Sequence, residues 1–403
     1  MDRSVTGQDA SDEVSAEGPL AGTLVVDLSR ALAGPHATMM LADLGARVIK
    51  VESPGAGDDS RGWGPPFVGP EDDPVSTYFL SCNRNKESVQ VDLKSAEGRD
   101  FLERLVRRAD VLVENFRTGV LSKLGFSEER VRELNPRLVL LSITGFGHDG
   151  PEADRPGYDQ IAQGEAGLMS LTGPSAAEPT RVGVPIGDLL AGMYGAYGVA
   201  SALVDRERTG NGTVVRTSLL AAIVGVHAFQ GTRYTVAGEV PVPIGNHHPS
   251  IAPYGAFRTS DGIIQVEVGT PGQWQAFITA IGLDADDARF ETNTDRVGHR
   301  KELIEEIEKQ LAGATSGEWL TSLARAGVPA GAVRSLDEVY TWDQTLRQGL
   351  LVDVDHPTAG RIRLPGPALR VESMSGQPRG RTQHQPPPLL GQHDEAVRAW
   401  LAD

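Results

Sequence analysis

The sequence is poor in cysteine, in long apolar runs and in positive charge, and each shortage excludes a class of protein. Cys82 is the single cysteine among 403 residues, so the chain cannot form an internal disulfide and fits a reducing compartment. No stretch reaches the about 18 apolar residues that a membrane-spanning helix needs. The 38 Lys and Arg residues face 54 Asp and Glu, giving a formal net charge of −16. A field of that sign disfavours nucleic acid and anionic membranes as partners.

The N-terminal stretch MDRSVTGQDASDEVSAEG is polar and acidic, unlike a signal or transit peptide. We interpret residues 1–19 as a disordered lead. The chain as a whole has an ordinary globular composition, with 39% hydrophobic and 23% charged residues, and its length suits two or three domains. These features predict a soluble cytoplasmic protein in which Cys82 is a buried thiol rather than a nucleophile.

Strands and helices alternate through the first 150 residues. Apolar runs that predict strands occur at 22–29, 46–52, 110–115 and 138–144. Helices are predicted between them, with Pro35 in the first turn of one and Ser95 as the cap of another. Because strand–helix–strand units pair in parallel, this region predicts an open Rossmann-like α/β domain. Ligands of such domains collect at the carboxyl ends of the strands.

The rest of the chain changes in texture twice. Residues 157–205 are rich in Gly, Ala and Leu and predict helices whose small residues allow close packing. The stretch YGAFRTSDGIIQVEVG predicts a β-hairpin, and helical stretches follow it, so residues 228–335 predict a small α+β domain. A second hairpin, a Pro-rich arm and a terminal helix then lead us to expect that residues 336–403 complete the large domain of residues 20–227.

The stretch GFGHDG at residues 145–150 matches G-x-G-x-x-G, the glycine pattern of dinucleotide-binding folds. That interpretation requires a helix that begins at the last glycine. Pro151 and Pro156 instead predict an irregular loop, and the stretch follows the fourth predicted strand rather than the first. The pattern therefore does not indicate NAD or FAD, and the chain has no phosphate-binding P-loop sequence either.

Other common catalytic patterns are also missing. The chain has nine histidines, yet only His247 and His248 are adjacent and no H-E-x-x-H or C-x-x-C occurs, so we expect no metal site. No G-x-S-x-G indicates a serine hydrolase. Basic residues do recur in the predicted loops of the α/β domain, and two interpretations stay open for them: a local anion site or scattered surface charge. These residues are Arg84, Lys86, Lys94, Arg117 and Lys123.

Asp188 stands out in the stretch RVGVPIGDLLAGMYGAYG, because it is the only acidic residue between Glu178 and Asp205. It lies where a Gly- and Pro-bearing segment passes into an apolar helix, so its spacing favours a helix N-cap. A carboxylate there has a second interpretation. The helix dipole would keep it ionised and weak hydration would leave it reactive, as a carboxylate nucleophile requires. Both roles are compatible.

Several separated stretches together resemble the class III coenzyme A transferase family, which includes formyl-CoA transferases, carnitine CoA-transferases and 2-methylacyl-CoA racemases. They are GTLVVDLSRALAGPHATMMLADLGARVIKVESPGAGDDSRGW, ADVLVENFRTGVLSKLGF, GYDQIAQGEAGLMSLTG and VGVPIGDLLAGMYGAYG. The resemblance covers about residues 20 to 395. It implies an open α/β large domain, a small α+β domain and an interlocked, ring-like homodimer. It also implies acyl-CoA and a carboxylic acid as substrates, with no tightly bound cofactor.

The resemblance assigns Asp188 as the catalytic nucleophile, which forms an aspartyl–acyl anhydride and then an aspartyl-CoA thioester. It implies coenzyme A contacts along the sheet edge. The sequence departs from the formyl-CoA transferases in having Leu32 for Gln, Ser53 for Arg, Lys123 for Arg and Thr144 for Lys. The residues expected to contact coenzyme A are Leu32, Ala33, Val91, Lys94, Asn115, Phe116, Arg117, Lys123, Thr144, Gly145, Phe146 and Gly147.

Racemases of this family pair the aspartate with a histidine, because they need acid and base groups on opposite faces of the substrate carbon. Here Tyr158 stands at the histidine position, and tyrosine is a poor base at neutral pH. The comparison favours a transferase over a 2-methylacyl-CoA racemase. The stretches SIAPYGAFRTSDG, TNTDRVGHRKELI, HPTAGRIRLPGPALR and PPPLLGQH resemble the succinyl-CoA–glutarate branch, which implies a small dicarboxylate acceptor. Arg181, His247 or His248 would hold its distal carboxylate.

Overall fold

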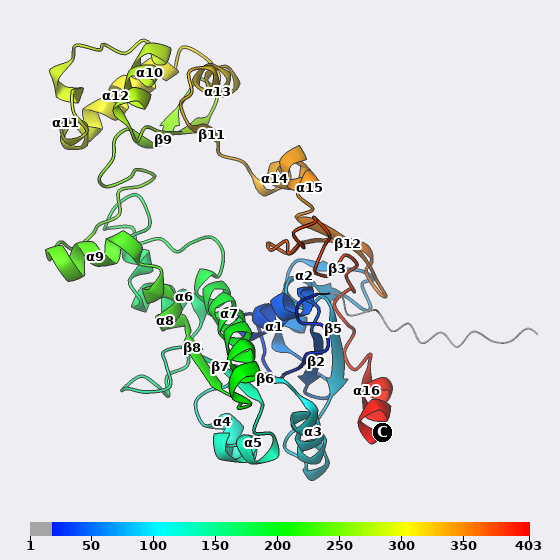
Figure 1. The fold of residues 1–403 in the computed structure, drawn as a ribbon. Helices are drawn as coiled ribbons and strands as arrows, with labels where there is room; N and C mark the ends of the chain where they lie inside the picture. The colour runs from blue at the N-terminus through cyan, green and yellow to red at the C-terminus, as the bar shows by residue number, and fades with distance from the viewer. Residues whose placement is uncertain (1–17) are drawn as a thin grey trace, which may run out of the picture. The chain divides into compact units, whose positions relative to one another are not determined.

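The computed structural model describes residues 18–403 (Figure 1). The chain forms two compact units. The first takes in the described residues up to Ala166, together with Val184–Val226 and Arg347–Asp403. The second comprises Gly167–Gly183 and His227–Leu346. No helix within residues 18–403 is long and apolar enough to cross a membrane.

The first unit is built on a six-stranded sheet in the order β5-β2-β1-β6-β7-β8, and every neighbouring pair is parallel. The strands are β1 (Leu24–Asp27), β2 (Arg47–Glu52), β5 (Lys86–Gln90), β6 (Val111–Glu114), β7 (Val139–Thr144) and β8 (Val214–Ser218). The predicted open parallel α/β fold is confirmed. The chain moves outward from β1 through β2 to β5 and then returns to the other side of β1. The switch point therefore lies between β1 and β6, where such sheets bind ligands.

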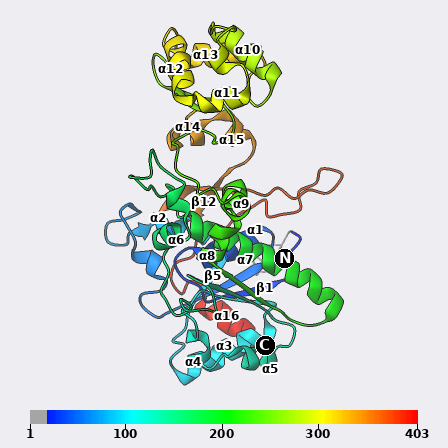
Figure 2. The ribbon, with the colours of Figure 1, turned by 90° about the vertical axis from the view of Figure 1, so that its left-hand side faces the viewer.

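Helices cover both faces of this sheet (Figure 2). Helices α1 (Ala33–Asp43), α7 (Ile186–Thr209) and α8 (Leu219–Gly225) lie on one face, and α3 (Ala96–Arg108), α5 (Glu128–Leu134) and α16 (Asp394–Ala402) lie on the other. Ser95 caps α3 as predicted, since its side chain accepts a hydrogen bond from Gly98 N. The apolar face of α3 then packs with strand residues and α16 in one core. Pro35 occupies the first turn of α1, as expected.

Three glycines of α7 allow the close packing that the sequence predicted. A Cβ atom on Gly192 would lie 2.6 Å from Ala33 O, and one on Gly198 would lie 2.5 Å from Val215 Cγ1. Gly195 faces Leu141 at 3.0 Å in the same way. The start of α7 therefore lies beside the start of α1, because bulkier residues would push the two helices apart.

The loop after β7 is irregular, as the two prolines predicted, and the next helix is α6 (Asp159–Glu165). Gly145 contacts Gly157 through the backbone, since a Cβ on Gly145 would lie 2.5 Å from Gly157 Cα. Gly147 and Gly150 have φ values of 114° and 89°, in the region that favours glycine. The glycines of GFGHDG thus serve tight turns and close backbone contact.

Shorter elements complete the first unit. They are η1 (Asp59–Gly62), β3 (Phe67–Val68), β4 (Val75–Ser76), α2 (Thr77–Leu80), α4 (Val120–Lys123), β12 (Leu351–His356) and β13 (Gly360–Pro365). Strands β12 and β13 form the second predicted hairpin, and α16 is the predicted terminal helix. The C-terminal segment is attached to the α1 region through side chains, because Arg84 donates to Pro365 O and Arg381 donates to Ala42 O.

The second unit contains the antiparallel sheet β11-β10-β9, in which β9 and β10 form the first predicted hairpin. Its core joins Phe257 and Ile264 of this sheet to Phe277 and Leu311 from the helices. This unit combines an antiparallel sheet with helices, and it also takes in residues 167–183 and 336–346, which the sequence predicted to belong to the large domain. Its elements are η2 (Leu168–Ser170), α9 (Ala228–Ala237), β9 (Tyr254–Arg258), β10 (Ile263–Glu267), α10 (Pro271–Ile281), η3 (Ala288–Phe290), α11 (Asn293–Gly298), α12 (Arg300–Leu311), α13 (Ser316–Arg325), β11 (Ala330–Ala332) and α14 (Leu336–Thr341), with α15 (Asp343–Arg347) at the boundary.

Candidate active site

Two loops meet at the switch point of the parallel sheet. Asn115, directly after β6, accepts a hydrogen bond from Arg30 N through Oδ1 at 2.8 Å and donates through Nδ2 to Arg30 O at 2.7 Å. Both polar atoms of the Asn115 amide are thus engaged by the loop after β1. Asn115 therefore holds the two loops together. The sequence had predicted for it a contact with coenzyme A and not this structural role.

The residues predicted to contact coenzyme A belong to the first unit and follow the carboxyl ends of β1, β5, β6 and β7. Exposure divides them into three groups. The buried residues are Leu32, Ala33, Val91, Thr144 and Phe146; the half-buried ones are Asn115, Phe116, Gly145 and Gly147; the exposed ones are Lys94, Arg117 and Lys123. Val91 packs in the core between the sheet and α3, so its side chain does not face the ligand-binding end of the sheet, where the carboxyl ends of the strands lie.

The loop basic residues were expected to be either an anion site or scattered surface charge, and for two of them both interpretations are wrong. Arg84 is buried and pairs with Asp43 at 2.6 Å. Lys86 is buried at the start of β5 and pairs with Asp27 at 3.1 Å. Their charges are neutralised inside the unit, so of the five only the exposed Lys94, Arg117 and Lys123 are accessible to a phosphate.

Asp188 is the third residue of α7 and does not cap it, so the N-cap interpretation is wrong. Pro185 precedes the helix and offers no side-chain cap. Asp159 supplies the cap from α6: its Oδ1 accepts from Gly187 N at 2.7 Å and from Asp188 N at 3.3 Å. Its Oδ2 accepts from Gln163 Nε2 at 2.7 Å. Within residues 18–403, no hydrogen bond reaches the Asp188 carboxyl, which leaves that group available for chemistry.

The acidity of Asp188 also differs from expectation. Burial, with the negative charge of Asp159 nearby, raises the pKa of Asp188 from 3.8 to about 7. The helix dipole was expected to keep this carboxylate ionised, but loss of water and a like charge outweigh it. A weakly solvated carboxylate that ionises near neutral pH is a suitable nucleophile, and perturbed groups of this kind mark functional sites.

One aromatic side chain, Tyr78, lies near enough to Asp188 to be affected by its charge. Leu189 and Tyr78 pack against the cluster of Leu32, Met39 and Cys82. Burial, together with the charge of Asp188, raises the pKa of Tyr78, so its hydroxyl remains a proton donor. The edge of Trp63 contacts Tyr78 with ring centroids 4.9 Å apart.

Cys82 is fully buried, and burial raises the pKa of its thiol to about 11. It is therefore a protonated thiol at neutral pH, and the buried-thiol prediction is confirmed. Sequence reasoning missed Tyr78, Trp63 and Asp159. Of these, Asp159 had a signal, since it is the acid of the GYD stretch.

A cavity of about 1050 Å³ adjoins this cluster within the first unit. Tyr78, Pro185 and Leu189 line it together with residues of the C-terminal segment, whereas Asp188 itself is not among the lining residues. His36 also lines it, and burial together with the charge of Arg84 lowers the pKa of His36 to about 4. The imidazole is therefore neutral, whereas Arg84, Arg370 and Glu372 bring charged groups to the same cavity wall.

The remaining predicted substrate residues are dispersed. Tyr158 precedes α6 in the first unit and is 66% exposed. Arg181, His247 and His248 belong to the second unit. His247 packs against Phe257 and His248 stacks on Phe229. Burial, with the charge of Arg300, lowers the pKa of both histidines, so they are neutral at pH 7.

Comparison with known proteins gives a consistent picture. The sequence model of CoA-transferase family III matches residues 20–394. Succinyl-CoA:glutarate CoA-transferase of Homo sapiens is 40% identical over 96% of this chain and 87% of its own length. Succinate--glutarate CoA-transferase of Agrobacterium fabrum is 40% identical over 97% of this chain and 98% of its own length. The fold agrees as well. The crystal structure of a CAIB/BAIF family protein from Brucella suis matches with a TM-score of 0.84 and 39% identity, covering 96% of this chain and 100% of that one.

Proposed function

The chain belongs to CoA-transferase family III, and from that premise we propose that it transfers coenzyme A from succinyl-CoA to a small dicarboxylic acid such as glutarate. The near full-length match to transferases named for these substrates supports the choice. The structural observation that carries the proposal is Asp188. Its carboxyl has no hydrogen-bond partner among the described residues and ionises near pH 7, and the next residue along α7, Leu189, lines a cavity that α1 also lines.

The proposed reaction exchanges bonds at the Asp188 carboxyl. Its carboxylate attacks the donor thioester, the C–S bond breaks, and coenzyme A leaves as a thiolate while an aspartyl–succinyl anhydride remains. The thiolate then attacks the aspartyl carbonyl of this anhydride, which releases succinate and leaves an aspartyl-CoA thioester. The acceptor carboxylate attacks that thioester and again forms an anhydride and a thiolate. Attack of the thiolate on the acceptor carbonyl gives the new acyl-CoA and restores Asp188.

Neighbouring groups would support these steps. Asp159 fixes the first turn of α7 through Gly187 N and Asp188 N, and so orients the nucleophile. The protonated Tyr78 hydroxyl is a candidate donor to the oxyanion that forms at the attacked carbonyl. The exposed cations Lys94, Arg117 and Lys123 are the proposed partners of the coenzyme A phosphates, and the 145–147 turn would form a wall of the nucleotide site.

We also propose the interlocked homodimer that the family resemblance implies. Large apolar side chains exposed on α7 and α8 or at their ends support it, since contiguous exposed apolar surface marks association sites. They are Met193, Tyr194, Tyr197, Val224 and Val226. Arg181, His247 and His248 remain the proposed contacts of the distal carboxylate of the acceptor.

A panel of acceptor acids with succinyl-CoA as the donor tests the substrate assignment. Glutarate and similar small dicarboxylates should give the highest kcat/KM, and monocarboxylates of equal chain length should be at least about tenfold poorer, because they lack the distal charge. New acyl-CoA species are separated by chromatography. The assignment fails if no carboxylic acid accepts coenzyme A, and exchange of an α-proton for deuterium in a 2-methylacyl-CoA would identify a racemase instead.

The rate should depend on pH through Asp188. Because its carboxylate must be ionised to attack, kcat/KM for succinyl-CoA should rise about tenfold per pH unit below 7 and level off above it. The Asp159→Asn variant keeps an acceptor for Gly187 N but loses the like charge, so its acid limb should move to lower pH. The matched control is Asp154→Asn, an exposed carboxylate, which should keep the wild-type profile. An unmoved midpoint in Asp159→Asn would contradict this account.

A further inference from the structure

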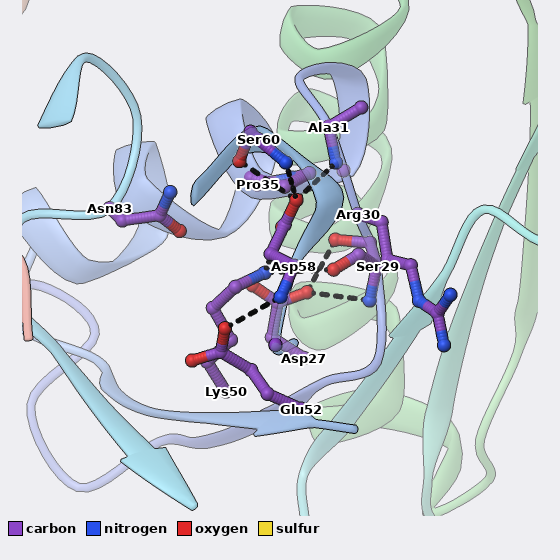
Figure 3. A network of polar contacts seen from close by, with 12 residues as sticks. Asp27, Ser29, Arg30, Ala31, Pro35, Lys50, Glu52, Asp58, Ser60 and Asn83 are labelled. Atoms are coloured by element: carbon purple, nitrogen blue, oxygen red, sulfur yellow. Dashed lines mark hydrogen bonds and ion pairs between the residues drawn. The ribbon is translucent and has the colours of Figure 1, made fainter. Parts of the chain in front are cut away.

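Side chains bond every backbone polar group of Ser29–Ala31, between β1 and α1, and Figure 3 shows the part to which Asp27, Lys50 and Asp58 contribute. Ser29 N donates to Asp27 Oδ1 at 2.9 Å, and Ser29 O accepts from Lys50 Nζ at 2.8 Å. Asn115 bonds both polar groups of Arg30. This segment therefore does not depend on neighbouring backbone for its hydrogen bonds, as a strand or helix would.

Ala31 completes the pattern. Its N–H donates to Asp58 Oδ1 at 3.1 Å, and its carbonyl accepts from Cys82 Sγ at 3.6 Å. The φ of Ala31 is 63°, in the left-handed region that residues with a Cβ atom avoid. Five side chains from separate points of the chain thus bond the backbone of these three residues. Together they hold Ala31 at a φ that alanine would not adopt unaided.

Lys50 and Asp58 lie at the centre of this arrangement. Lys50 Nζ lies 2.8 Å from Asp58 Oδ2, and both side chains are buried. Lys50 also reaches Ser29 O, whereas Asp58 also accepts from Ser60 N and Ser60 Oγ. One ion pair therefore connects the two ends of the segment.

The held segment leads directly into the candidate active site. Leu32 and Ala33 follow Ala31, and Ala33 O is in close contact with Gly192 of α7. Gly192 lies four residues after Asp188 and so shares its helix face. The conformation of Ala31 thereby sets where the first turn of α1 lies relative to the Asp188 carboxyl.

We propose that Lys50 and Asp58 are positioning residues for CoA transfer, which hold Ala31 in its left-handed conformation and so place the Leu32–Ala33 turn against the turn that carries Asp188. This inference rests on the proposed function only for the role of Asp188. Neither residue contacts the reacting atoms. Their effect is preorganisation, in which a displacement of about 1 Å costs about 100-fold in rate.

The test is a rescue experiment on the purified full-length protein, in the oligomeric state that it adopts in solution. Lys50→Met should lower kcat/KM for succinyl-CoA by about 100-fold and weaken the binding of coenzyme A measured by calorimetry. The double variant with Ala31→Gly should have a kcat/KM about tenfold higher than Lys50→Met alone, because glycine adopts the required φ without support. Ala31→Gly alone should change kcat/KM less than about threefold, since the segment is already held.

Arg84→Met is the matched control, because it also removes a buried cation from an ion pair but does not contact residues 29–31. Adding Ala31→Gly to Arg84→Met should leave its kcat/KM unchanged. If Lys50→Met does not fold, the Asp58→Asn variant with and without Ala31→Gly gives the same comparison at nearly unchanged side-chain volume. Equal activity of Lys50→Met and wild type, or a loss that Ala31→Gly leaves untouched, would overturn the proposal. Asp188→Asn, assayed in parallel, reports separately on the proposed function.

Discussion

The Asp188→Asn variant should lose CoA transfer by at least about 1000-fold in kcat. An amide of the same size keeps the packing at the start of α7, yet it cannot ionise and cannot form an anhydride. Transfer from succinyl-CoA to glutarate, followed by chromatography of the acyl-CoA products, measures the loss. The exposed Asp154→Asn substitution in the same unit should leave kcat unchanged.

The stability of this variant shows whether the loss reflects chemistry or misfolding. The folded pKa of Asp188 is about 7 and the ordinary value is 3.8, so the folded protein resists ionisation of this group. The resulting destabilisation is absent well below pH 3.8 and grows as the pH rises to 7. At pH 8 the variant should therefore unfold at a higher temperature than wild type. Retained transfer, or a variant that is less stable at pH 8, would contradict the role assigned to Asp188.

Among the substitutions proposed, Asp27→Asn should destabilise the protein most, lowering the free energy of unfolding by about 3–5 kcal/mol. Asp27 is fully buried, accepts from Ser29 and Thr38, and pairs with Lys86. Neutralising it leaves Lys86 as a buried charge without its carboxylate. The midpoint of urea denaturation at pH 7 measures the loss.

The pH dependence and a double variant test this explanation. Burial alone would raise the pKa of Asp27, but Lys86 and Lys50 outweigh it and hold the pKa at about 2. Its stabilisation is therefore complete above pH 3.8 and is lost as the pH falls toward 2, so wild type and variant should converge there. Asp27→Asn combined with Lys86→Met should cost less than the sum of the two single changes. Strict additivity would mean that the pair is not coupled.

The sequence predicted the elements whose apolar periodicity was clear and missed those in which it was broken. The runs at 46–52 and 138–144 became β2 and β7 within a residue of their expected starts. Strand β5 was missed because KESVQ reads as a polar loop. Its Lys86 is buried where Asp27, on a distant part of the chain, pairs with it and Pro35 O and Asn83 Oδ1 accept from it. Such pairings have no local signal in the sequence.

The same limit applied to the site. The isolation of Asp188 in an apolar stretch identified it as a candidate nucleophile, whereas the raised pKa of its carboxyl did not follow from the sequence. Local spacing suggested a cap and a helix dipole, but Asp159, 29 residues earlier, supplies the cap and opposes the charge. Likewise, Asn115 looked like a ligand contact, and only the fold shows that Arg30 engages its whole amide.

Trapping the acyl-enzyme with hydroxylamine tests the central claim most directly. The protein is incubated with succinyl-CoA and hydroxylamine, digested and analysed by mass spectrometry. The peptide that contains Asp188 should carry an aspartyl hydroxamate, and the same peptide of Asp188→Asn should carry none. CoA transfer that proceeds while Asp188 stays unmodified, or a hydroxamate formed at another residue, would contradict the account.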